Sequence, residues 1–107
     1  MGWVPLKDAQ EWANILSSSR EKAQIVFKHS TRCSISLLAK SRLEKYFREE
    51  DSFYLLDLLN YRSISNTIAS DLQVEHQSPQ VLVIHDGKCI YHVSHSGIEY
   101  DEVVKKL

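Results

Sequence analysis

A strand pattern that continues directly into a helix constrains the fold of this chain most. Residues 25–29 form a short β-branched and aromatic run, and a polar turn at residues 30–32 follows it without a long loop. The helical apolar pattern begins just after Cys33 and comprises Ile35, Leu38, Ala39, Leu43, Tyr46 and Phe47. It stops at residues 49–51, an acidic run typical of a solvated helix end, and residues 53–58 form a nearly continuous apolar strand pattern. These segments predict a strand–helix–strand unit with parallel strands.

The flanking segments complete the order of elements. Asp8 can cap a first helix, which the serines at 17–19 end and whose apolar residues are Ala9, Trp12, Ala13 and Leu16. A short helix is predicted over residues 65–72, and the strand patterns 81–85 and 88–93 are joined by Asp86-Gly87, a strong hairpin signal. Gly97 precedes a last helix with an apolar stripe of Tyr100, Val103, Val104 and Leu107.

This order of elements predicts a single α/β domain over residues 1–107. A chain of 107 residues is long enough for one hydrophobic core and too short for two domains. We predict a central four-stranded mixed sheet with helices on both faces and a right-handed crossover.

The composition limits the classes of partner. Hydrophobic residues make up 43% of the chain, charged residues 25%, and the formal net charge is -1, values of an ordinary globular protein rather than a nucleic-acid-binding one. No apolar run approaches the roughly 20 residues of a membrane span, and the first five residues lack the pattern of a signal peptide. We therefore expect a cytoplasmic protein without nucleic-acid or membrane partners.

Cys33 is the candidate nucleophile. The free N–H groups and the positive end of the predicted helix should favour its thiolate, which is the reactive form. Arg32, with Lys28 and His29 upstream, can add positive potential. The alternative is a small buried apolar residue, which is common for a free cysteine. The serine-rich polar segment 30–36 argues against it, because such a turn is costly to bury unpaired.

The segment HSTRCSIS, residues 29–36, resembles the active-site segment of the small monothiol bacilliredoxins. The order of elements, with Ser78-Pro79 ahead of the hairpin, is similar to the thioredoxin superfamily along nearly the whole chain. Proline usually follows the cysteine in bacilliredoxins, whereas this chain has Ser34. This departure leaves the nucleophile in place but removes the ring that would fix φ in the turn.

The resemblance implies monothiol chemistry. Cys33 would attack a mixed disulfide, take over the attached small thiol, and wait for a second thiol to release it. It further implies bacillithiol as co-substrate, no tightly bound cofactor, and S-thiolated proteins as partners. Separately, we expect a monomer. The residues that would support Cys33 are Thr31, Arg32, Ser34, Ile35 and Ser36.

Two positions distinguish this chain from dithiol members of the superfamily. Ser36 stands where the second cysteine would be, and a hydroxyl cannot form a disulfide. Ser36 can donate a hydrogen bond toward the thiolate, or it can bond the backbone in the first helical turn. Dithiol members also place a buried proton-relay acid six residues before the nucleophile, a position that Phe27 occupies here.

Two further segments are expected near Cys33. The resemblance implies a cis Ser78-Pro79 bond, with the backbone of Ser78 pairing with substrate; the alternative is that Pro79 only begins a strand. The loop at residues 94–97 returns to the same end of the sheet. The N–H groups of Ser96 and Gly97 could hold a carboxylate of the small thiol, or the loop could be a plain connection.

Cys89 is a weaker candidate. Across the hairpin turn it should pair opposite Ile84, at the end of the sheet remote from Pro79 and too far from Cys33 for a disulfide. We expect Cys89 to fill space in the core or at the sheet edge. Strand alternation places Cys89 and His92 on opposite faces, so we predict no metal site among His85, Cys89, His92 and His95.

The leading hypothesis is thus a thiol-disulfide oxidoreductase that removes a low-molecular-weight thiol from protein cysteines. The first alternative is an iron-sulfur cluster carrier of the monothiol glutaredoxin type, although the glycine-containing segment typical of those carriers is replaced by Ser34-Ile35. The second is a thioredoxin-fold interaction module without turnover.

Overall fold

Five strands form one mixed sheet in the computed structural model, which describes residues 2–107. The strand order is β1-β3-β2-β4-β5, with β1, β3 and β2 parallel to one another and β4 antiparallel to both of its neighbours. The elements are β1 (Gly2–Pro5), α1 (Ala9–Ser18), β2 (Gln24–His29), α2 (Ser34–Tyr46), β3 (Ser52–Asp57), α3 (Arg62–Leu72), β4 (Gln80–His85), β5 (Lys88–Ser94), the 3-10 turn η1 (His95–Gly97) and α4 (Tyr100–Val104). The predicted α/β class, a mixed sheet with helices on both faces, is confirmed.

The prediction of four strands was wrong by one, because it omitted β1. This edge strand has four residues and pairs in parallel with β3, Gly2 opposite Ser52 and Pro5 opposite Leu55. Glycine and proline are both depleted in strands, and proline is tolerated at an edge, where one side of the backbone needs no partner. So short a segment carries no alternating pattern that could reveal it.

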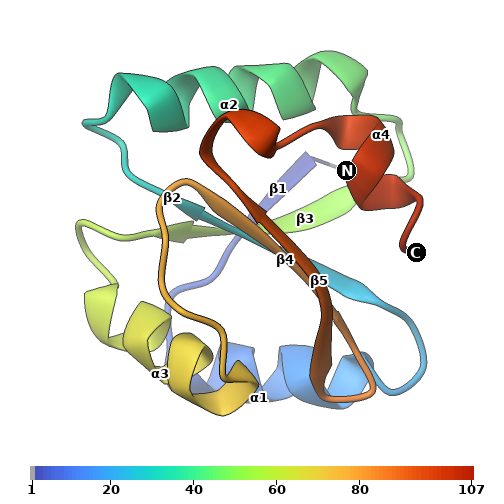
Figure 1. Ribbon diagram of the computed structural model, residues 1–107. Coiled ribbons are helices and arrows are strands. Elements are labelled where there is room, and N and C mark those ends of the chain that lie inside the picture. Colours follow the sequence, from blue (N-terminus) through green and yellow to red (C-terminus); the bar gives the residue numbers. More distant parts are fainter. Residues whose placement is uncertain (1) are drawn as a thin grey trace.

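The helices cover the two faces of the sheet in pairs, α1 with α3 and α2 with α4 (Figure 1). The α1–α3 face buries a cluster that includes Trp12, Ile15 and Ile68 against Val26 and Leu82 of the sheet. A second cluster on the α2–α4 face is built from Ile25, Phe27, Ala39, Leu43, Phe53, Val81, Val83 and Val103. None of the helices in residues 2–107 is long and apolar enough to cross a membrane.

Three predicted helical stripes differ from the structure. In α1, Ala9 and Ala13 are exposed, and Ile15, which was not predicted, is buried. In α2 only Ser36, Ala39 and Leu43 are buried, whereas Ile35 and Leu38 are 54% and 64% exposed. A narrow buried stripe on α2 is enough to cover this face of the sheet, because η1 and α4 cover the rest of the face. Helix α4 ends at Val104, and Leu107, expected on its buried stripe, lies beyond it and is 56% exposed.

The chain reversal before β5 and the bend before β4 are both as predicted. Asp86 and Gly87 adopt positive φ angles of 55° and 74° in the hairpin, a conformation that suits glycine. The Ser78-Pro79 peptide bond is cis. The carboxyl end of β2, the beginnings of α2 and α3, and the beginning of β4 lie at one end of the sheet, on the left in Figure 1.

Candidate active site

Cys33 lies where β2 gives way to α2. It is the N-cap residue of the helix, with extended backbone angles (φ -103°, ψ 122°), and its N–H donates to the Ser30 carbonyl at 3.2 Å. The first helical hydrogen bond runs from the Leu37 N–H to the Cys33 carbonyl at 2.9 Å. The N–H groups of residues 34–36 therefore have no partner within the helix, and α2 has no acidic residue in its first turn, so this end of α2 attracts negative charge.

Ser36 holds the turn that carries Cys33. Its fully buried hydroxyl oxygen accepts the Ser30 N–H at 3.0 Å and lies 2.6 Å from Nδ1 of His29. Of the two roles open from the sequence, the geometry matches the one in which Ser36 bonds the local backbone, with His29 as an additional partner.

His29 is an uncharged partner for that hydroxyl. It is 2% exposed and stacks on Phe27. Burial lowers the pKa of His29 below its usual value, and the positive charge of Lys40 lowers it further. The neutral His29 imidazole therefore joins the end of β2 to Ser36 of α2 without adding a buried charge at the beginning of the helix.

A cavity of about 290 Å³ opens beside the cysteine. It brings together Cys33 and Ser78, which the sequence analysis placed in one site. Pro79, which follows Ser78, is buried and immediately precedes β4. The remaining lining residues, which the sequence analysis did not place in the site, are Ser30, Leu58, Leu59, Arg62 and His76.

The other predicted site residues lie outside this lining. Thr31, Arg32, Ser34 and Ile35 are exposed on the turn and the first turn of α2. Ser96 and Gly97 form η1, whose first residue donates its N–H to the Pro79 carbonyl at 3.0 Å. The Ser96 carbonyl accepts from Arg42 of α2 at 3.5 Å, so η1 packs on the helix rather than lining the Cys33 cavity.

A buried basic cluster behind the cavity was not predicted, although Lys28 itself was expected to add positive potential near Cys33. Lys28 has no exposed surface, and its Nζ lies 3.2 Å from the Ser65 carbonyl and 3.5 Å from Nδ1 of His76. Ser65 Oγ is 3.2 Å from the same ring nitrogen. The available signal was a lysine in the middle of a strand whose flanking residues are apolar or aromatic.

The family assignment follows from the sequence of residues 4–103, which matches the family described as monothiol bacilliredoxin BrxC. The chain belongs to the monothiol bacilliredoxin family. The match confirms the resemblance drawn from residues 29–36 and spans the cysteine, the cis-proline and the basic cluster.

Solved structures show that the fold is that of the thioredoxins. A thioredoxin-fold protein with a provisional assignment as an oxidoreductase is 26% identical, with a TM-score of 0.85 over 96% of this chain and 91% of that one. Thioredoxins share the fold at lower identity. The Malassezia sympodialis protein is 12% identical (TM-score 0.74, 99% and 87% of the two chains), and the Fasciola hepatica protein is 17% identical (TM-score 0.70, 99% and 95%). Family and fold together indicate a thiol oxidoreductase.

Cys89 has the surroundings of a structural residue in this bacilliredoxin. It pairs with Ile84, as predicted, and packs against the core of the α1–α3 face. Its sulfur lies 3.3 Å from the Tyr91 carbonyl, and burial raises the pKa of the Cys89 thiol. A thiol whose ionisation is disfavoured is a poor nucleophile.

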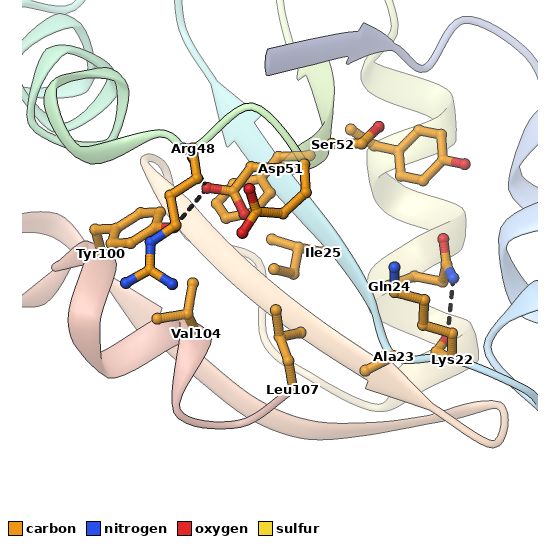
Figure 2. A pocket seen from close by; sticks show the side chains of 13 residues that line it. Lys22, Ala23, Gln24, Ile25, Arg48, Asp51, Ser52, Tyr100, Val104 and Leu107 are labelled. Atoms are coloured by element: carbon orange, nitrogen blue, oxygen red, sulfur yellow. Dashed lines mark hydrogen bonds between the residues drawn. The ribbon is translucent and has the colours of Figure 1, made fainter. Parts of the chain in front are cut away.

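A second cavity, of about 350 Å³, lies at the opposite end of the sheet (Figure 2). Asp51, Tyr100 and Arg48 line it. The Asp51 carboxylate accepts from the Tyr100 hydroxyl and from the Arg48 backbone N–H. The Asp51 carboxylate thus links the end of α2 to α4 beside this cavity.

Proposed function

We propose that this protein removes a low-molecular-weight thiol from mixed disulfides on other proteins, with Cys33 as the nucleophile and bacillithiol as the thiol. The observation that carries the proposal is the position of Cys33. Its sulfur stands at the free N-terminus of α2, beside an open cavity and the cis Ser78-Pro79 bond, with a buried serine where a second cysteine would be. Membership of the monothiol bacilliredoxin family supports bacillithiol as the co-substrate.

The reaction is a pair of thiol-disulfide exchanges. In the first, the Cys33 thiolate attacks the sulfur of the small thiol, a new disulfide forms on Cys33, and the substrate cysteine leaves with the electron pair of the old bond. In the second, an incoming thiolate attacks the small-thiol sulfur and releases Cys33. Ser36 carries a hydroxyl, which cannot form a disulfide, and Cys89 packs against the core of the α1–α3 face, so release requires a thiol from another molecule.

The surface around the cavity supports a protein as the source of the mixed disulfide. Leu59 lines the cavity and is 50% exposed, and Ile35 is exposed on the first turn of α2. Exposed apolar side chains at the mouth of a cavity favour contact with another macromolecule. The polar residues Thr31, Arg32 and Ser34, next to Cys33 in the chain, are exposed as well.

Intact-mass spectrometry with two matched cysteine variants tests the proposal. After exposure to a protein carrying bacillithiol as a mixed disulfide, the wild-type chain and Cys89→Ser should each gain one bacillithiol, and Cys33→Ser should gain none. The substrate should be released as free thiol only where Cys33 is present. An adduct on Cys89, or unimpaired release by Cys33→Ser, would refute the proposal.

Two further arms address the specificity and the alternative function. The same substrate carrying glutathione should react more slowly if bacillithiol is the co-substrate. Anaerobic incubation with iron, sulfide and a small thiol should produce no visible cluster absorbance. Cluster absorbance that depends on Cys33, without thiol transfer, would favour the cluster-carrier function.

A further inference from the structure

One wall of the Cys33 cavity has no role in the exchange described above. His76 lines the cavity together with Cys33. Its Nδ1 lies 3.2 Å from Ser65 Oγ and 3.5 Å from Lys28 Nζ. Both Lys28 and Ser65 are completely buried, so His76 joins an interior ammonium group to the space in which the sulfur reacts.

The contacts of His76 assign its tautomer. An ammonium group can only donate hydrogen bonds, so Nδ1 is the acceptor in its contact with Lys28, and we assign the ring proton to Nε2. Burial and the positive charges of Lys28 and Arg62 lower the pKa of His76, which keeps the ring neutral. A neutral imidazole in this tautomer can give up the Nε2 proton while it takes another on Nδ1.

Lys28 is suited to exchange that second proton. Burial and the charge of Arg62 lower its pKa to about 8, so both the ammonium and the amine are accessible near neutral pH. The charges that act on Lys28 and His76 are all positive: Lys28 comes from β2, Arg62 from α3 and His76 from the segment before β4. Glu75, next to His76 in the chain, is exposed.

We propose that His76 donates and accepts the proton of the thiol exchange at Cys33, and that Lys28 supplies and recovers this proton through the imidazole ring. This proposal rests on the proposed function, and it assigns a proton path to a chain that has Phe27 where dithiol relatives have a buried acid.

The proton balances over one cycle. When Cys33 attacks, the leaving sulfur takes the electron pair of the old disulfide and the Nε2 proton of His76, while Nδ1 takes a proton from the Lys28 ammonium. When the second thiol arrives, it gives its proton to Nε2, and Nδ1 returns a proton to the Lys28 amine. The resulting thiolate attacks the disulfide on Cys33, and the Cys33 sulfur leaves as the thiolate with which the cycle began.

Two disulfides of the same small thiol provide the test. In one, the leaving group is thionitrobenzoate, an acidic aromatic thiol that departs readily as the thiolate; in the other, it is an alkyl thiol, a poorer leaving group whose departure a proton donor assists. His76→Gln should slow the single-turnover reaction of the alkyl disulfide by about 100-fold, the low end of general acid–base contributions. The aromatic disulfide should react within about twofold of the wild-type rate, because no proton transfer assists that step.

Two further variants complete the experiment. Lys28→Met should slow the alkyl disulfide selectively as well, and it should change the pH profile of that reaction while leaving the profile of the aromatic one in place. His92→Gln replaces an exposed histidine of β5 and should change neither rate. Native far-ultraviolet circular dichroism establishes that each variant is folded.

The outcomes separate this proposal from the proposed function. Equal slowing of both disulfides by His76→Gln, or no slowing of either, would overturn the proton path while leaving Cys33 as the nucleophile. A wild-type chain that reacts with neither disulfide would refute the proposed function itself.

Discussion

Lys28, the buried lysine of β2, lies behind the candidate site and destabilises the fold. Lys28 points to the α1–α3 face, where its strand neighbour Val26 belongs to the hydrophobic cluster. No carboxylate among residues 2–107 forms a salt bridge with it, and its main compensation is the Ser65 carbonyl at 3.2 Å. Burying an ammonium group without a carboxylate partner is energetically unfavourable. A destabilising buried group behind a candidate active site is typical of proteins that give up stability for chemistry.

Lys28→Met should therefore raise the free energy of unfolding at pH 7. Lys28 has a folded-state pKa of about 8, below the 10.5 of an exposed lysine. The unfolded chain thus binds more protons between these two values, and the wild-type protein gains stability as pH rises from 8 to 10.5. The advantage of the variant should be roughly 2 to 3 kcal/mol below pH 8 and should largely disappear by pH 10. Urea unfolding at pH 7 and pH 10 measures both values.

The matched control for this prediction is Lys88→Met, which replaces an exposed lysine at the beginning of β5. It should change the free energy of unfolding by less than about 0.5 kcal/mol at either pH. A Lys28→Met variant that is less stable than the wild-type protein at pH 7 would mean that the bond to Ser65 outweighs the desolvation of the ammonium group.

At the scale of elements, the connection between α2 and β3 joins several elements at the end of the sheet remote from Cys33. The acidic residues 49–51 look like a solvated helix end in the sequence, yet Asp51 is only 8% exposed. Its carboxylate accepts the Arg48 N–H at 2.7 Å and the Tyr100 hydroxyl, and its carbonyl accepts the Gly2 N–H at 2.7 Å. These partners lie far apart along the chain, which is why no local pattern predicted the burial of Asp51.

Tyr100→Phe should lower the free energy of unfolding by about 1 to 3 kcal/mol, because it removes a buried hydrogen bond to a charged carboxylate. Burial and the bond to Asp51 raise the pKa of Tyr100 to about 12. The contribution of the hydroxyl should therefore be complete below pH 10 and should be lost as pH rises from 10 to 12. Urea unfolding of the variant and the wild-type protein at pH 7 gives the difference.

Tyr46→Phe is the matched control for Tyr100→Phe, since Tyr46 is 55% exposed on α2. It should leave the free energy of unfolding nearly unchanged. If the two substitutions lowered the free energy of unfolding equally, the hydrogen bond between Tyr100 and Asp51 would make no specific contribution to stability. Asp51 would then stabilise the α2–β3 connection without α4.

At the scale of the whole molecule, the sequence was informative wherever an element has its own pattern. The strand–Cys33–helix unit, the hairpin at Asp86-Gly87 and the order of the helices were all predicted. The edge strand β1 was not, because it is only four residues long. Cys33 and Ser78 could be placed in one cavity from the order of elements, whereas His76 could not, because the loop before β4 has no pattern that sets its direction.

The two faces of the sheet should unfold together, since β2, β3 and β4 contribute residues to both hydrophobic clusters. Trp3 packs on Phe27 and Phe47 on the α2–α4 face, with ring centroids 5.3 Å and 5.0 Å apart, and Trp12 is buried on the α1–α3 face. Single-tryptophan variants can therefore report each face separately.

Trp12→Phe leaves Trp3 as the fluorescent reporter of the α2–α4 face, and Trp3→Phe leaves Trp12 as the reporter of the α1–α3 face. Each substitution should lower the free energy of unfolding, by about 1 to 3 kcal/mol, because it removes buried aromatic surface. Within each variant, however, the fluorescence and circular dichroism transitions in urea should share one midpoint, as expected for a small cooperative domain. A Trp3 transition that precedes the circular dichroism change would show instead that β1 and its contacts with α2 separate from the sheet before the Cys33 end unfolds.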